Sequence, residues 1–458
     1  MGSLKIFLIG SLILSWTPFV ALHGQELSPP ADSNMVSGDT SSSLPYKKIS
    51  VHGSVRMEGG QIVKGQYGQL GLGIKEYEHL WTSRQFLKLN ARIDVNERLR
   101  VACGITGKLW FDNFPGTTRN DPGEVYEPNY DFYFDRAEGL VRVLGSWEKP
   151  LLMLSSGTFP FKYNPDVRNL GEYMFRGAIS PGYLITDFDF AYARLSGIKA
   201  FNTFNLGMCA INQNLLFTTE AQIFPFNDFT LSYLLGADIG KFFSFGAGIS
   251  LWHLLSVNES ATTPKITTNI MYIDSSMNPQ DTVYYTSRGT KLMARASFDP
   301  KPFIPIAWIF GKEDLKIYAE ALVIGLKNYK EVYKHIGDRI PLTFGFNFPG
   351  FRLLDVLAIE GEWYGSPYWD ANLNLSKYGP LPQPDDPRGG NSIDGFTFDN
   401  WKWSVYAKKT IFGGLSFVGQ AARDHMRMSE KYSKYKDYEA ALEQNGHWWW
   451  MLKIQYDF

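Results

Sequence analysis

The sequence has few of the residues that build disulfide frameworks, metal sites or active sites. Its 458 residues include two cysteines, Cys103 and Cys209, too few for a disulfide framework. Its seven histidines are scattered without a ligand spacing such as HExxH, so we expect no metal and no cofactor. Glu360 and Glu362 share one strand face, but adjacent positions on one face of a strand are always a fixed distance apart. The sequence therefore does not predict an enzyme.

Two broader features are also missing. The net charge is −1, so no general attraction to nucleic acid is implied. After the N-terminus no apolar run has the length of a membrane helix, and the mean hydropathy of −0.20 excludes a bundle of such helices. It does not exclude a membrane β-barrel, because the alternating strands of a barrel average out their hydropathy.

The N-terminus has the pattern of an export signal. Lys5 precedes an apolar core at Ile6–Leu14, and the small residues Ala21 and Gly24 follow as cleavage points. We expect residues 1–24 to be a signal peptide, and residues 25–47, rich in Ser, Pro, Asp and Gly, to be a flexible periplasmic tail.

Alternation with a period of two dominates the remaining chain. Leu87, Leu89 and Ala91, for example, alternate with Lys88 and Asn90, which places the two sets on opposite faces of a strand. Such runs, bounded by turn residues, predict about sixteen strands. They lie near 48–58, 84–95, 99–110, 131–145, 150–159, 189–201, 206–219, 229–239, 242–253, 288–298, 314–325, 340–348, 353–364, 400–410, 414–424 and 447–458.

The connections between these strands alternate in length. Short ones such as Asn96–Arg98 and Gly240–Lys241 alternate with long ones such as Gly59–Ser83 and Pro160–Phe188. One connection on the short side, Asp299–Glu313, is longer than its peers. Short turns at one rim and long loops at the other are typical of outer-membrane barrels, whereas a soluble sandwich has no reason to sort its loops. The sequence therefore predicts an all-β fold, a transmembrane antiparallel up-and-down β-barrel over residues 48–458.

The last stretch, HWWWMLKIQYDF, carries the most specific signal. Trp448, Trp450, Leu452, Ile454, Tyr456 and Phe458 alternate with a set that is mostly polar towards the end. This stretch resembles the closing strand of bacterial outer-membrane β-barrels, which ends in Phe with an aromatic residue two positions earlier. The resemblance implies a Gram-negative outer membrane, contact with its lipid, and an assembly signal at Tyr456 and Phe458 that the barrel-assembly machinery reads.

A barrel of sixteen strands leaves an aqueous channel, so its inward charges decide which solutes pass. We expect more basic than acidic side chains on the inner face, while pairing across strands neutralises some of them. The expected lining residues are Arg56, Lys88, Arg92, Arg100, Lys108, Arg136, Arg142, Arg194, Arg295, Lys316, Glu320, Glu360, Glu362, Lys402, Lys408 and Lys453.

The long connection after the fifth strand, residues 160–188, stands where a constriction loop lies in sixteen-stranded porins. The resemblance to porins is one of position, and it implies that the loop folds into the barrel; an ordinary external loop is the alternative. The charged residues that would line the constriction are Lys162, Asp166, Arg168, Glu172 and Arg176.

We therefore expect a porin-type channel for passive diffusion of small hydrophilic solutes, with a modest preference for anions, possible assembly as a homotrimer, and no nucleic-acid partner. The alternative is a surface adhesin or carbohydrate-binding barrel. In that case Tyr368, Trp369 and Tyr378 would form an aromatic platform with the proline-rich run from Pro380 to Pro387.

Overall fold

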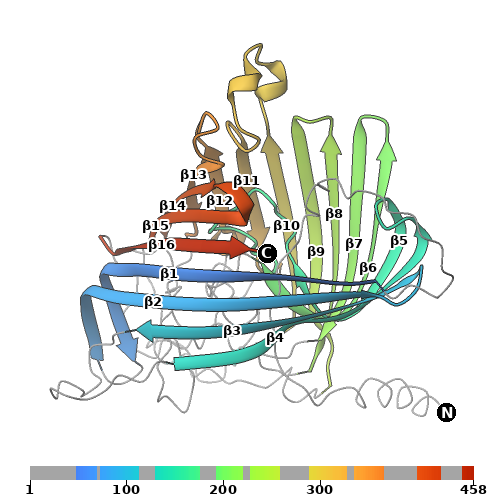
Figure 1. Cartoon of the computed structure of the whole chain (residues 1–458), viewed down its shortest axis with the longest axis horizontal. Coiled ribbons are helices and arrows are strands. Elements are labelled where there is room, and N and C mark those ends of the chain that lie inside the picture. The colour runs from blue at the N-terminus through green and yellow to red at the C-terminus, as the bar shows by residue number, and fades with distance from the viewer. Residues whose placement is uncertain are drawn as a thin grey trace, which may run out of the picture.

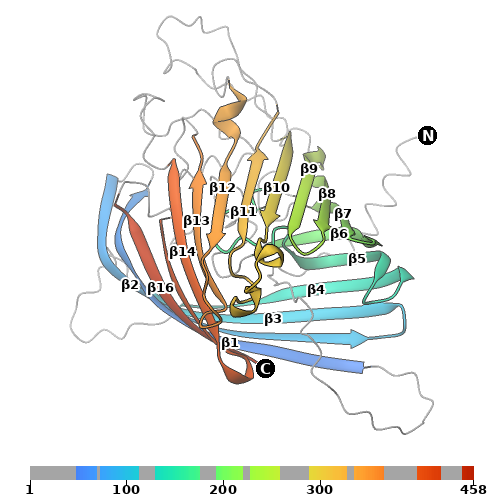
Figure 2. The same cartoon turned by 90° about the horizontal axis from the view of Figure 1, so that it is seen from above.

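The protein is a closed antiparallel β-barrel (Figures 1 and 2). The computed structural model describes residues 48–69, 73–112, 129–175, 192–219, 227–257, 288–326, 335–365, 400–423 and 446–458. Within these ranges sixteen strands each pair with their neighbours in chain order, and β1 pairs with β16 to close the ring. The strands are β1 (Lys48–Gln69), β2 (Gly73–Asp94), β3 (Leu99–Asp112), β4 (Asn129–Gly145), β5 (Pro150–Phe161), β6 (Ala193–Leu206), β7 (Cys209–Thr219), β8 (Phe229–Ile239), β9 (Phe243–Leu255), β10 (Gly289–Phe298), β11 (Ile317–Val323), β12 (Leu342–Asn347), β13 (Val356–Trp363), β14 (Trp401–Thr410), β15 (Leu415–Arg423) and β16 (Trp448–Asp457).

The strands form where apolar and polar residues alternate, because each set then has its own side of a single-layered wall. On β1, Val51, Val55 and Met57 are exposed on the outside, whereas Glu58 is buried inside. On β12 the exposed Leu342 and Phe344 alternate in the same way with the buried Thr343. The outer surface is consequently a continuous apolar band, and the predicted all-β barrel is confirmed.

All sixteen predicted strands are present, and the largest difference concerns the first connection. Residues 59–83 were expected to be mostly loop, but β1 and β2 stay paired as far as Gln69 and Gly73. β16 pairs with β1 only as far as Lys64, so the β1–β2 pair extends beyond its neighbour. The first hairpin is therefore a long two-stranded ribbon.

The short connections lie together at one rim and are built by local hydrogen bonds. Asn96 accepts hydrogen bonds from the backbone N–H groups of Arg98 and Leu99, both at 2.8 Å, and Gly240 adopts a left-handed φ of +58°. The connection 299–316 is the exception in length and holds two 3₁₀ turns, η2 (Lys301–Phe303) and η3 (Ala307–Ile309). It extends past the ends of β10 and β11 in Figure 1.

Several sequence predictions lie outside the described residues. They are the signal peptide and tail at 1–47, Arg176, and the aromatic platform around Tyr368, Trp369 and Tyr378. The two cysteines are described, and both are free on outward positions of β3 and β7, which are not neighbours in the ring.

The seam between β1 and β16 ends at the C-terminal residue. Gly53 and Phe458 exchange two backbone hydrogen bonds of 2.8 Å each. The Phe458 ring lies over Gly53 so closely that a Cβ there would overlap it, and it stacks on Tyr456 with ring centroids 6.1 Å apart. Phe458 is thus a structural contact of the seam as well as a proposed assembly signal.

Loss of the seam contact and loss of the assembly signal should have different effects on the barrel. Two exposed hydrogen bonds contribute about 2 kcal/mol in total, too little to prevent a barrel from closing. We expect deletion of Phe458 to abolish heat-modifiable, membrane-integrated barrel in cells, because the assembly signal is lost. Refolding of purified protein into detergent should be only weakly affected. Loss in both assays would mean that the seam contact alone matters, and normal levels in cells would contradict the assembly signal.

Candidate functional site

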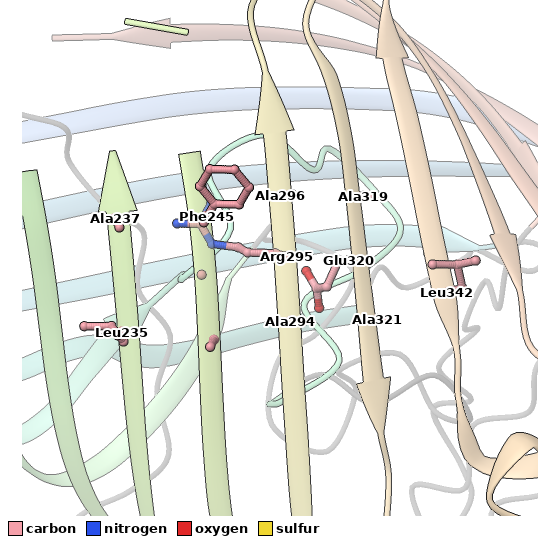
Figure 3. Close-up of a pocket in the computed structure, with 12 residues that line it drawn as sticks. Leu235, Ala237, Phe245, Ala294, Arg295, Ala296, Ala319, Glu320, Ala321 and Leu342 are labelled. Carbon is pink, nitrogen blue, oxygen red and sulfur yellow. The ribbon is translucent and has the colours of Figure 1, made fainter. Parts of the chain in front are cut away.

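The loop that follows β5 runs into the barrel and contacts the opposite wall. Residues 162–175 hydrogen-bond to side chains of β11, β12 and β13, which lie six to eight strands away from β5 in the ring of sixteen. In Figure 3 this loop, coloured teal, passes behind β10 and β11, close to Glu320. A loop placed in this way occupies part of the interior that the sequence assigned to the channel.

Glu360 on β13 is the main attachment point. Its carboxylate accepts hydrogen bonds from three consecutive backbone N–H groups, those of Arg168 at 2.5 Å, Asn169 at 2.8 Å and Leu170 at 2.9 Å. The Tyr318 hydroxyl donates a fourth at 2.9 Å. Hydrogen bonds to a carboxylate are about twice as strong as neutral ones, so this single side chain fixes one turn of the loop.

Two further carboxylates hold the loop beside Glu360. Glu320 on β11 accepts hydrogen bonds from the Tyr163 hydroxyl at 2.6 Å, from Asn164 Nδ2 at 2.8 Å and from the Tyr173 N–H at 3.0 Å. Glu362 on β13 accepts one from the Tyr173 hydroxyl at 2.7 Å and pairs with Lys402 Nζ at 2.7 Å. These buried carboxylates are satisfied by the loop, as buried charges must be.

The charged residues of the loop itself mostly stabilise its own shape or its attachment. Glu172, at a left-handed φ of +64°, accepts hydrogen bonds from the N–H groups of Tyr163 and Asn164. Arg168 pairs with Glu313 at 2.8 Å, and Asp166 with Lys316 at 3.3 Å. Lys162 Nζ donates to the Val167 carbonyl at 2.8 Å.

An apolar core inside the barrel supports the same loop. Tyr173, Met174 and Phe175 are buried against inward-facing residues of the strands from β5 to β11. Fully burying such a side chain contributes about 1.5–3 kcal/mol, so the loop is held by packing as well as by hydrogen bonds. This side of the interior is therefore filled. The strand residues of the core are Phe159, Phe161, Ala193, Leu195, Leu216, Leu234, Met293 and Leu322, and Ile324 and Tyr364 adjoin them.

A single β-sheet separates this core from the outside, and its outward side chains here are small. Ala247, Ala294, Ala296, Ala319 and Ala321 lie on the outer face of β9, β10 and β11, where they form a shallow hollow beside Leu235, Phe245 and Leu342 (Figure 3). Arg295 and Glu320, at positions between these alanines, belong to the inner face.

The remaining interior is lined by a basic wall on β16, β1, β2 and β3. Arg56 lies 4.0 Å from the centre of the Phe86 ring, and Lys108 lies 5.6 Å from it on the other side. Arg84 and Lys88 flank Phe86 on the inner face of β2. On this wall Glu58 pairs with Arg56 at 2.9 Å and with Lys453 at 3.4 Å. Among the described inner-face residues of these four strands, basic side chains outnumber the acids Glu58, Asp94 and Asp457.

Other predicted lining residues lie near the short-turn rim or on the neighbouring wall. Arg100 pairs with Asp94 at 2.8 Å and covers the Trp147 ring at 3.7 Å, and Arg92 and Arg142 lie beside them. Arg136 pairs with Glu138 at 2.5 Å, and Arg295 donates to Ser244 at 3.3 Å. Lys408 lies on the inner face of β14, as Lys402 does.

The prediction that Arg194 lines the lumen was wrong, because Arg194 lies on the outer face of β6. Ala193 and Leu195 on either side of it belong to the interior core, and its cross-strand partner is Pro160. The core residues fix which face of β6 points inward, and Lys199 is the basic residue that shares that face.

The sequence analysis missed Arg84, Lys199 and Tyr318. Arg84 has the same parity as Lys88 and Arg92, so the alternation of β2 could have identified it. Lys199 was missed because Arg194 was expected to point inward, which would put Lys199 on the outer face of β6. Tyr318 carries no sequence signal, because its role depends on contact with Glu360.

The ion pairs that join Glu313 to Lys316 and to Arg168 of the loop should be insensitive to mild acid. Burial and the neighbouring Glu320 hold the pKa of Tyr163 well above its usual range, and burial and Glu362 do the same for the pKa of Tyr173, so both hydroxyls remain donors. Burial alone would raise the pKa of Glu313, but Lys316 and Arg168 outweigh it and lower the pKa below the ordinary 4.5. A carboxylate with a lowered pKa keeps its ion pairs at and above its ordinary pKa and loses them as pH falls through the folded value.

We therefore expect single-channel conductance to stay constant from about pH 7 to about pH 5, once the change in bulk conductivity is corrected for. Conductance should change only below the ordinary pKa of Glu313. A step in conductance near neutral pH would contradict this account of the attachment.

The described part of the chain offers no other candidate chemistry. It contains no group of three or more His, Cys, Asp or Glu side chains that could hold a metal ion. None of the helices in the described ranges has the length and apolarity needed to span a membrane.

Comparison with known proteins found similar architectures among solved structures. OprB of Pseudomonas putida is 9% identical, with 90% of this chain and 94% of that chain covered and a TM-score of 0.49. OmpF of Salmonella typhi, in a complex with daunomycin, is 10% identical, with 90% and 98% covered and a TM-score of 0.43. A triple mutant of Rhodopseudomonas blastica porin is 8% identical, with 90% and 100% covered and a TM-score of 0.39. No family model and no curated protein matches the sequence.

The closed ring and its apolar band define the class of fold. A single-layered barrel whose outer face exposes Ile49, Val51, Leu87, Leu89 and Phe344 requires lipid around it, because exposing so much apolar surface to water costs free energy. Closed barrels with short turns at one rim are outer-membrane proteins. The described chain therefore has the fold of an outer-membrane β-barrel.

Proposed function

We propose that the protein is a passive channel for small hydrophilic solutes, with a modest preference for anions. One observation carries this proposal: the interior loop is attached to the β11–β13 wall, and its apolar core fills the β5–β11 side. A solute would pass between the loop and the basic wall formed by β16, β1, β2 and β3, so residues 162–175 would act as the constriction.

The anion preference follows from where the charges lie. The acids Glu320 and Glu360 are covered by hydrogen-bond donors of the loop and Glu362 pairs with Lys402, whereas the inner face of the basic wall carries Arg56, Arg84, Lys88 and Lys453 beside Glu58. A narrow polar passage with low-dielectric walls concentrates the ion of opposite sign.

Single-channel recording in planar bilayers tests the proposal. We expect a stable open current and, under a gradient of KCl, a reversal potential of the sign that marks chloride preference. The preference should weaken at high salt, since the screening length falls from about 10 Å at 0.1 M to about 3 Å at 1 M. A silent barrel would contradict the channel, and cation selectivity would contradict the role of the basic wall.

Two partners complete the proposal. The outer-membrane lipid contacts the apolar band, and the barrel-assembly machinery reads the C-terminal strand. Assembly as a homotrimer is part of the same proposal, and chemical cross-linking in intact membranes would test it.

A further inference from the structure

One arc of the short-turn rim exposes several large apolar side chains. The rim arc, defined as residues 240–242, 299–316, 348–355 and 411–414, joins the ends of the strands from β8 to β15 and is described throughout. Its exposed apolar side chains include Trp308 at 72%, Leu353 at 76% and Phe412 at 82% exposure. The turns at 95–98 and 146–149, on the other side of the rim, expose Asn96, Glu97, Arg98, Glu148 and Lys149 instead.

The rim arc is a defined structure. Asp314 is buried and accepts hydrogen bonds from the N–H groups of Gly311 at 2.9 Å and Phe351 at 3.1 Å. Arg352 Nε donates to the Phe310 carbonyl at 3.3 Å, and the rings of Phe310 and Phe351 lie 5.7 Å apart. These contacts join the connection 299–316 to the neighbouring turn, and Figure 2 shows the two side by side. The exposed apolar side chains are therefore held in place at the surface.

The rim arc continues the surface that faces lipid. Phe303 packs on Phe242 at 5.2 Å and on Phe298 at 6.3 Å. Phe298 stacks on Phe243 at 4.9 Å, and Phe243 on Phe245 at 5.7 Å, both of them exposed on the outer face of β9. This unbroken row of rings runs from the membrane wall onto the connection 299–316, which places the rim arc at the boundary between lipid and water.

The exposed charged residues of the rim arc all have the same sign. Its exposed charged residues are Lys241, Lys312 and Arg352, all basic. Its acids are less exposed and engaged: Asp299 pairs with Lys301 at 2.8 Å, Glu313 with Lys316 and Arg168, and Asp355 lies 4.0 Å from Lys409. Basic and aromatic side chains beside an apolar membrane wall match the headgroups and the first carbons of anionic lipids.

We propose that the rim arc is a binding surface for anionic phospholipid in the leaflet at the short-turn end of the barrel. Phe303, Ile306 and Trp308 would lie among the lipid chains near the headgroups, while Lys241, Lys312 and Arg352 would contact the phosphates. The inference rests on membrane insertion of the barrel and is independent of whether the channel conducts.

The test uses the full barrel in lipid nanodiscs, which leave both rims open to solvent. Cys103 and Cys209 are replaced by Ala, and an environment-sensitive fluorophore is attached to Trp308→Cys or to the matched control Glu97→Cys on the polar side of the same rim. Nanodiscs contain phosphatidylcholine with or without phosphatidylglycerol, and brominated versions of either lipid serve as quenchers. Heat-modifiable migration confirms that each variant is folded, separately from any measurement of conductance.

We expect the label at 308 to be shielded from aqueous iodide and quenched more strongly by brominated phosphatidylglycerol than by brominated phosphatidylcholine. Each basic residue near an anionic surface contributes about a fivefold preference, so neutralising Lys241, Lys312 and Arg352 to Gln should remove the selectivity. The label at 97 should be open to iodide and show no lipid preference.

Three results would overturn the proposal. The label at 308 could be as open to iodide as the label at 97, or the two brominated lipids could quench it equally. It could also become shielded only when an acidic periplasmic protein is added, which would assign the surface to a protein partner.

Discussion

Replacing Glu360 with Ala is expected to release the interior loop and to raise the single-channel conductance. The change leaves the N–H groups of Arg168, Asn169 and Leu170, together with the Tyr318 hydroxyl, without their acceptor. Each hydrogen bond to a charged group contributes about 1.5–3 kcal/mol, so the attachment loses of order 5 kcal/mol, enough to reverse a population of about 99:1. Conductance traces should show a larger and noisier open level than the unmodified protein.

Two controls separate loop release from a general change of the lumen. Gln420→Ala alters an inner-face residue of β15, two strands away from Glu360 on β13, and should leave conductance unchanged. A disulfide between Asn169→Cys and a cysteine at Glu360, in the background without Cys103 and Cys209, should restore the low conductance under oxidising conditions only. Unchanged conductance in Glu360→Ala would mean that Glu320, Glu362 and the apolar core hold the loop without Glu360.

Neutralising the basic wall is expected to have the second large effect, on ion selectivity. In Arg84→Gln/Lys88→Gln, Arg56 and Lys453 remain to pair with the buried Glu58. Removing a charge near a narrow passage changes the energy of a passing ion by of order 1 kcal/mol, equivalent to about a fivefold change in the chloride-to-potassium ratio per charge. The reversal potential should move towards cations at 0.1 M salt and much less at 1 M.

Lys149→Gln is the matched control for the basic wall, because it removes an exposed charge on a rim turn and should shift the reversal potential little. If the control shifts it as much as the double variant, selectivity arises from the total charge of the barrel and not from the wall.

The strands and most of the inner-face residues could be predicted from the sequence, because the alternation of side chains along a strand is a local property. The parity of Leu87 and Lys88 holds whatever lies inside the barrel. The alternation shows which face of a strand a residue lies on, but not what that face contacts inside the barrel. Glu320, Glu360 and Glu362 were expected to line water, and they accept hydrogen bonds from backbone N–H and tyrosine hydroxyl groups of a loop about 150 to 200 positions earlier in the chain. Contacts so distant in sequence leave no periodic signal.

The error at Arg194 has the same physical origin. On β6 the polar residues occur at both parities, so a charged side chain alone could not show which face points inward. The interior core decides it, through Ala193 and Leu195. That core is itself invisible in the sequence, since its members look like ordinary lipid-facing residues.

The position of the apolar core has a consequence for the order of assembly. All its members lie between Phe159 and Tyr364, on β5 to β11, in the interior loop and just after β13, whereas the seam joins β1 to β16. An open sheet containing β5 to β13 can thus enclose its own loop before the two ends of the chain meet. We therefore expect this core to form before closure, as a nucleus of the kind found in soluble domains. On that order of assembly, the strands that carry the basic wall join last.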